Sequence, residues 1–259
     1  MTRILSLVLL LAALAAPAAG QATCSSMEEC PGLVLREAGF QREIATAGAN
    51  ALLGGATAAL FRILRGEPAW GAFWRGAVGG GVAYAGKRVA VEDFYGAGLA
   101  GREVASVGGS MVRNASLGWG LFEQIVLPVG PVRLYVSADS GVVPRVDLST
   151  LIVSVAFMAT YNARLDLAES VSSGALIFRG DSPMPGMTSA GATVAWSDMP
   201  ASEGPRLMAH ERVHIVQYDQ MFLTWGEQLE RWAVRKAPLS DRVENHLDLG
   251  LTAVGLRSG

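Results

Sequence analysis

The sequence predicts an α+β protein with glycine-rich N-terminal helices, a central antiparallel sheet and a C-terminal helical region. Residues 21–117 are rich in Gly and Ala, which indicates closely packed helices. Residues 118–197 are instead rich in Val, Ile, Leu and Thr, with Pro and Gly between the runs. Residues 198–259 contain apolar side chains that recur at helical intervals. The chain is long enough for these regions to form one large domain or two small ones.

Residues 1–20 predict a cleaved export segment. Arg3 supplies a positive charge, and the apolar run from Ile4 to Ala16 is too short to span a bilayer comfortably. Small residues that suit a cleavage site follow in Ala-Pro-Ala-Ala-Gly. The use of Arg in preference to Lys, with abundant Ala and Gly, is typical of high-GC bacteria. We therefore expect a bacterial protein of the periplasm, the cell envelope or the secreted fraction.

Charge and cysteine content narrow the classes of partner and of metal site. The formal net charge is −2, so the sequence shows no basic surface for nucleic acid. Cys24 and Cys30 are the two cysteines, and in an oxidising compartment we expect them to form a local disulfide. As zinc ligands they lack a nearby second pair of ligand residues.

The glycine-rich region, residues 21–117, requires a physical reason for its glycines. Each Gly inside a helix costs up to about 1 kcal/mol relative to Ala. Small residues four apart allow two helix backbones to touch, and Gly76–Gly80 and Ala97–Gly101 have this spacing. We therefore expect tightly packed helices in this region.

Membrane association is the alternative explanation for the same region. Ala45 to Phe61 is a run of 17 uncharged residues, at the short limit for a membrane span. Arg62 and Arg65 end that run, and Arg75 interrupts the next one. We favour helices that are soluble or peripheral to a membrane over true spans, and peripheral membrane association through these helices is the prediction.

Residues 118–197 predict an antiparallel sheet of about five or six strands. Turn-forming residues separate the β-rich runs, among them Pro128, Gly130 and the pairs Ser140-Gly141 and Ser173-Gly174. Ala192 to Ser197 predicts one more short strand immediately before the C-terminal helices.

The pattern His210-Glu211-Arg212-Val213-His214 is the most specific feature of the chain. Residues four apart on an α-helix share a face, so His210 and His214 can present two imidazoles to one metal ion. Glu211 lies beside them, where a general base would take a proton from water. Pro205 suits the first turn of this helix, with Ser202 or Gly204 as its cap. The pattern predicts a zinc site with a catalytic glutamate.

A third zinc ligand is expected downstream, where residues 241–249 predict a short helix. Glu244 and Asp248 are four residues apart and share a face. His246 points a little over half a turn away from Glu244, so the two are rival ligands.

This arrangement resembles the gluzincin metallopeptidases over residues 192–250. The resemblance implies that Glu244 is the third ligand, and that Asp248 accepts a hydrogen bond from a ligand imidazole. Gln217 and Gln220 stand where the metzincin pattern requires Gly and His. The run through Tyr218 is also similar to small exported bacterial HExxHxxQY proteins.

The resemblance implies zincin-like C-terminal helices and a zinc-dependent peptidase that acts on peptide or protein substrates. It further implies that the strand Ala192–Ser197 forms an edge along which an extended peptide pairs, although an ordinary sheet edge explains the pattern equally well. Tyr161, Tyr218 and His246 are open candidates for the oxyanion donor. The alternative is a non-catalytic envelope or membrane-associated protein with a structural or vestigial metal site.

Overall fold

The computed structural model describes residues 39–200 and 202–226, and over these ranges the protein is mixed α+β, as predicted. The predicted export segment, the Cys24–Cys30 disulfide and the helix 241–249 lie outside the described residues. The predicted division at residues 20, 117 and 197 therefore stays a prediction.

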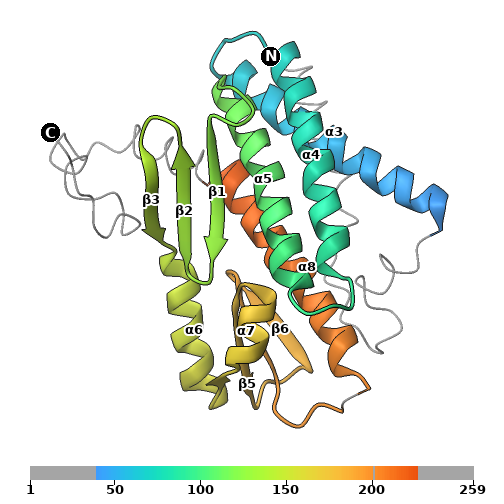
Figure 1. Cartoon of the computed structure of the whole chain (residues 1–259), viewed down its shortest axis with the longest axis vertical. Helices are drawn as coiled ribbons and strands as arrows, with labels where there is room; N and C mark the ends of the chain where they lie inside the picture. The colour runs from blue at the N-terminus through green and yellow to red at the C-terminus, as the bar shows by residue number, and fades with distance from the viewer. Residues whose placement is uncertain (1–38, 201, 227–259) are drawn as a thin grey trace, which may run out of the picture. The chain divides into compact units, whose positions relative to one another are not determined.

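Three long helices, α3, α4 and α5, occupy the glycine-rich region. They comprise Phe40–Leu64, Trp70–Ala90 and Ala97–Leu117. α4 packs along both of the others, and α5 separates α4 from the first sheet (Figure 1). A Cβ atom added to Gly76 would lie 2.5 Å from the carbonyl oxygen of Gly54, and one added to Gly80 would clash with the Asn50 backbone. The predicted close approach of helices through Gly76 and Gly80 is confirmed.

Two sheets follow. The first is the antiparallel meander β1 (Gln124–Val129), β2 (Val132–Ser137) and β3 (Gly141–Val146). The second has the order β4-β5-β7-β6 and comprises Arg164–Leu165, Leu176–Gly180, Ala192–Trp196 and Gly186–Ser189 in that order. β5 and β7 run parallel to each other, whereas the remaining pairs are antiparallel.

The predicted single antiparallel sheet over residues 118–197 is wrong, because these residues form two sheets, and the prediction fails in two further respects. One is the parallel pair β5–β7, and the other is that two of the β-rich runs are helices: α6 (Leu148–Tyr161) and α7 (Leu167–Ser173). Asp147 and Asp166 cap the two helices, because their side chains accept the Thr150 and Glu169 backbone N–H groups. Capping and tertiary packing override the β preference of the Val- and Ile-rich composition of α6.

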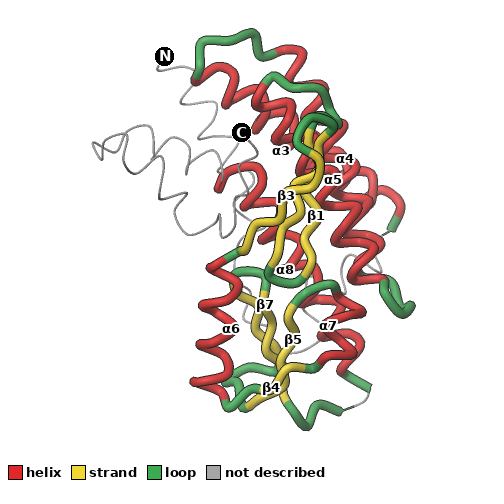
Figure 2. The backbone as a smooth tube through the Cα atoms, turned by 60° about the vertical axis from the view of Figure 1, so that its left-hand side comes forward, coloured by secondary structure: helices red, strands yellow, loops and turns green. Residues whose placement is uncertain are grey.

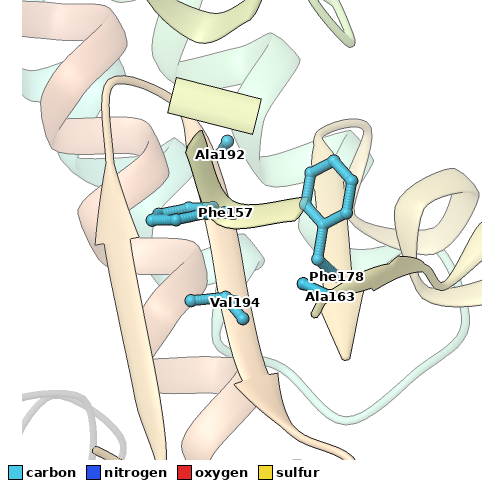
Figure 3. Close-up of a cluster of buried hydrophobic side chains, with 5 residues drawn as sticks. All are labelled: Phe157, Ala163, Phe178, Ala192 and Val194. Atoms are coloured by element: carbon cyan, nitrogen blue, oxygen red, sulfur yellow. The ribbon is translucent and has the colours of Figure 1, made fainter. Parts of the chain in front are cut away.

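α6 completes the core on one face of the second sheet. Its Phe157 packs with Ala163, Phe178, Ala192 and Val194 in a buried cluster (Figure 3). α6 and α7 lie on opposite sides of β5 and β7 in Figure 2. Because side chains alternate along a strand, the neighbours of Val194 on β7 face away from α6.

The predicted peptide-binding strand is also corrected. Ala192–Trp196 is an interior strand, since β7 pairs with β5 on one side and with β6 on the other. Ala190 and Gly191, both with positive φ, make the tight turn that folds β6 back beside β7. β6 is therefore the terminal strand of this sheet as far as the structure describes it.

The helix predicted around the histidines is α8 (Gly204–Met221), which continues as the π-helical turn η3 (Phe222–Gly226). Pro205 lies in its first turn, as predicted. The predicted cap is wrong: Glu203 occupies the N-cap position, without a side-chain hydrogen bond to the helix. α8 packs against α5, where Val216 joins Ala90 and Ala105 in a buried cluster.

Glu103 on α5 has a carboxyl group whose burial should make the stability of the fold depend on pH. Both of its carboxylate oxygens are buried without a hydrogen-bond partner in the described ranges, and burial raises the pKa of Glu103 to about 7. The native state therefore keeps a proton that the unfolded state loses near pH 4.5, so this group lowers stability as pH rises from 4.5 to 7. Glu103→Gln should raise the free energy of unfolding by roughly 1 to 2 kcal/mol at pH 8, after a discount for partial exposure. Urea titrations at pH 5 and pH 8 measure this gain in the free energy of unfolding. An equal gain at both pH values would contradict the raised pKa of Glu103.

Candidate metal centre

Side chains next to the two histidines fix α8 to three other elements. Arg212 donates to Glu169 of α7 at 2.9 Å, and Asp219 accepts from Arg102 of α5 at 2.6 Å. Tyr218 donates to Asp147, the residue that caps α6, at 3.0 Å. These contacts set both the axial position and the rotation of α8, so they also set where its histidines point.

His210 and His214 bring their Nε2 atoms to 3.1 Å from each other. Two nitrogens that lie 2.0–2.1 Å from a tetrahedral zinc ion are about 3.3 to 3.4 Å apart. The two rings are almost perpendicular, at 89°. The two Nε2 atoms thus lie within hydrogen-bond distance of each other, and a shift of a few tenths of an ångström would give the separation that a shared metal ion requires.

The Nδ1 atoms of the two rings differ in their partners. His214 Nδ1 lies 3.0 Å from Gln217 Oε1, and donation to this oxygen leaves the Nε2 lone pair of His214 for a metal. His210 Nδ1 is buried and has no hydrogen-bond partner in the described part of the chain. A metal-bound His210 would carry a proton on Nδ1 and would need an acceptor there.

Burial, and secondarily the neighbouring His214, lowers the pKa of His210 to about 4. The ring is therefore neutral at pH 7, which is the form that binds a metal ion. Protons should therefore compete with a metal ion for His210 itself only when the pH falls toward that value.

Glu211 lies under the edge strand β6 and is only 3% exposed. Its Oε2 accepts a hydrogen bond of 2.5 Å from Thr188 Oγ1, which also lies 2.6 Å from Thr193 Oγ1. A Cβ atom at Gly186 would lie 2.7 Å from Glu211 Oε1, so the absence of a side chain there lets β6 cross the carboxylate. Burial raises the pKa of Glu211, while the Thr188 hydrogen bond and His214 oppose that shift.

Tyr218 and Asp219, which follow His214 on α8, belong to a buried ionic network. Arg133 of β2 donates to Asp147 at 2.5 Å and lies 3.4 Å from Asp219. The Asp147 carboxylate and Ser149 engage the Tyr218 hydroxyl. Tyr218, a candidate oxyanion donor, is thus a member of this network. Tyr161 packs with Phe157 on the α6 side of the sheet.

The third predicted ligand is not tested by this arrangement. Within residues 39–200 and 202–226, no group of three or more His, Cys, Asp or Glu side chains is placed to hold a metal ion. Glu244, Asp248 and the rival His246 lie outside the described residues. The structure therefore supplies two converging imidazoles and an adjacent carboxylate.

A cavity of about 530 Å³ lies next to the other side of α8. Met208, Ala209 and Arg212 contribute to its lining, and the two histidines do not. At 100° per residue, Ala209 and Arg212 point away from the direction of His210 and His214. This cavity is therefore separate from the candidate metal centre.

Searches of protein-family models, of curated proteins and of solved structures found no match to this chain. The site must therefore be judged from its own residues. Sequence reasoning missed Thr188, because a hydroxyl on a strand 23 positions before Glu211 gives no local pattern. It also missed the anchoring role of Asp219 and Arg102. The available indication was the presence of Arg102 in a helix that is mostly Gly, Ala, Ser and Val and has only two other charged residues, Glu103 and Arg113.

Gln217 should support zinc binding without contacting the ion. Gln217→Ala removes the acceptor that fixes the His214 tautomer, so zinc affinity should fall roughly 10- to 100-fold. Gln220→Ala is the control, since no described contact joins its side chain to either histidine. Competition with a chromophoric chelator measures both variants. Equal affinities for wild type and Gln217→Ala would show that this hydrogen bond does not orient the ring.

Proposed function

We propose that this protein is an exported, zinc-dependent hydrolase, and specifically a metallopeptidase of the cell envelope or the secreted fraction. The observation that carries the proposal is the convergence of His210 and His214 beside a buried Glu211 at the edge of a sheet. The sequence resemblance to gluzincins supports the same chemistry. Zincin-like packing of the C-terminal helices is part of the proposal.

Zinc fits the described donors better than a hard cation such as magnesium. Two neutral imidazoles are ligands that zinc prefers, whereas magnesium and calcium require oxygen donors. The unpartnered Nδ1 of His210 suits a metal-bound imidazole that awaits an acceptor. Asp248 is the proposed acceptor, and Glu244 is the proposed third ligand.

The residues have distinct roles in this proposal. When bound, zinc would lower the pKa of its water to about 7 and polarise a substrate carbonyl. Glu211 would take the proton from the attacking water and pass it to the leaving amine. Thr188 orients the Glu211 carboxylate through its hydrogen bond. No residue is assigned as the additional oxyanion donor.

The edge strand β6 is the proposed contact for the substrate backbone. β7 pairs with one edge of β6, and the hydrogen bond from Thr188 holds β6 beside Glu211. An extended peptide that pairs with the other edge would lie along α8 near the histidines. We therefore propose that the substrate peptide pairs with Gly186–Ser189, and not with Ala192–Ser197 as the sequence resemblance implied.

One observation favours the alternative of a non-catalytic envelope protein. Glu211 is buried and accepts the Thr188 hydrogen bond, so in this conformation its carboxylate is covered by β6. A structural or vestigial metal site would tolerate such a carboxylate. A general base must reach water, so catalysis requires β6 or the Glu211 side chain to move.

Hydrolysis by metal-free and zinc-restored protein separates the two functions. Protein purified from the envelope of the expressing cell is stripped with a chelator and assayed on fluorescently labelled casein. We expect activity to disappear on stripping and to return with about one equivalent of zinc. Zinc that binds and restores no hydrolysis of casein or of a random peptide library would support the non-catalytic alternative.

A further inference from the structure

The outer side of the α3–α4 hairpin, residues 40–90, is an apolar surface without a described partner. Its exposed large apolar side chains are Phe40, Ile44, Leu52, Leu53, Ile63, Leu64, Trp70, Trp74 and Val78. A helix on the surface of a soluble protein normally carries charges on its outward face. Between Ala45 and Phe61, α3 carries none. Many exposed large apolar side chains on one helical hairpin favour a binding surface for a protein or a membrane.

Two tryptophans stand at one end of this surface. Trp70 is 71% exposed and Trp74 is 55% exposed. Trp70 stacks on Phe73 with ring centroids 5.8 Å apart and meets Trp74 edge-on at 5.4 Å. The rings thus support one another outside the core. Exposed tryptophans at the end of an apolar helix are typical of the interface between water and lipid headgroups.

The charge of the hairpin favours a membrane over a second copy of the chain as the partner of this surface. Residues 40–90 contain six basic and two acidic residues, a net charge of +4, whereas the whole chain is −2. Arg62 and Arg65 share Glu67 near one end of the apolar stretch, and Arg88 pairs with Glu43 near the other end, beside Arg42 and Lys87. Each end therefore keeps a net positive charge after these ion pairs are counted. Two such surfaces would repel each other, whereas anionic lipid headgroups would attract each one.

The packing of the hairpin decides how it can meet a bilayer. α3 is the one described helix that is long and apolar enough to cross a membrane by length and composition. However, its Gly54 and Ala58 side packs against α4, and an adjoining side of α4, which carries Gly79 and Gly86, packs against α5. α5 carries the buried Arg102 and Arg113 and contacts the first sheet. Lipid can therefore reach only the outer face of the hairpin.

We propose that the outer face of α3 and α4 docks onto an anionic lipid bilayer, with Trp70 and Trp74 in the headgroup layer and the protein on the membrane surface. The apolar side chains supply hydrophobic attraction, and the flanking basic residues supply electrostatic attraction. This surface lies on α3 and α4, whereas the candidate metal centre lies on α8. The proposal is therefore independent of the zinc hydrolase proposal.

Vesicle flotation tests this inference with protein purified from the expressing cell. The vesicles are phosphatidylethanolamine and phosphatidylglycerol at 3:1, with pure phosphatidylcholine as the neutral comparison. We expect binding to the anionic vesicles that weakens in high salt. Trp70→Ser with Trp74→Ser should reduce binding at least tenfold, because both rings are exposed and contribute little to the fold. Circular dichroism and thermal unfolding check that the variant remains folded.

The matched control is Ile152→Ser with Val155→Ser on α6. These side chains are 66% and 60% exposed, so the change removes a similarly exposed apolar pair from a different face. The control should bind vesicles as the wild type does. Three outcomes would overturn the proposal: no binding by the wild type, equal losses in the two double variants, or a self-associated wild type that Trp70→Ser with Trp74→Ser converts to monomers without a change in vesicle binding.

Discussion

His214→Ala will leave the protein folded and almost free of zinc. His214 and His210 converge at 3.1 Å, so the loss of either ring leaves one described imidazole at the site. The decrease in affinity should exceed the roughly 10- to 100-fold that an outer hydrogen-bond partner contributes. Zinc content after dialysis against a weak chelator should fall from about one equivalent to near zero.

His246→Ala is the control for this experiment. His246 is the third histidine of the chain and is not a proposed zinc ligand. The variant should therefore retain zinc as the wild type does. Thermal unfolding of the metal-free proteins shows whether each variant folds equally well. A His214→Ala protein that keeps one tightly bound zinc, or a His246→Ala protein that loses it, would mean that the ligand set is wrong.

Glu211→Gln will retain zinc while hydrolysis falls by about two to four orders of magnitude, the usual contribution of a general base. Gln is nearly isosteric with Glu, and its side-chain oxygen can still accept the hydrogen bond from Thr188. Removal of a raised-pKa carboxyl should not weaken the fold, because its burial opposes ionisation. The loss should therefore appear in kcat and leave zinc content unchanged.

His210→Ala is the comparison that gives this result its meaning. That variant should lose both zinc and hydrolysis, whereas Glu211→Gln should lose hydrolysis alone. Retention of wild-type turnover by Glu211→Gln would remove Glu211 from the mechanism. Zinc loss equal to that of His210→Ala would instead make Glu211 part of the metal site.

Local patterns predicted the local parts of the structure. Apolar residues at helical intervals, with Pro205 in the first turn, predicted α8. The i, i+4 spacing then predicted that His210 and His214 share a face. The spacing of Gly76 and Gly80 predicted the contact between α3 and α4. In both cases the information lies within a few residues of chain, where helix geometry relates sequence to space.

Features that depend on tertiary contacts were not predicted. The composition of α6 indicated strands, but the Asp147 cap and the packing of Phe157 against the second sheet favour a helix. The order of β6 and β7 depends on which strand pairs with β5, and that choice leaves no local pattern. Likewise, Arg102 and Asp219 are 117 residues apart in sequence, so neither predicts the other.

The zinc coordination of the purified protein decides whether His210 and His214 hold a metal ion. Zinc content by mass spectrometry and the zinc K-edge X-ray absorption spectrum report stoichiometry, donor type and distance together. We expect one zinc per chain, bound by two imidazole nitrogens at about 2.0 to 2.1 Å with oxygen donors in the remaining positions. A protein that binds no zinc when it is supplied, or a spectrum with sulfur neighbours at about 2.3 Å, would contradict the assignment of His210, His214 and Glu211 to a zinc hydrolase.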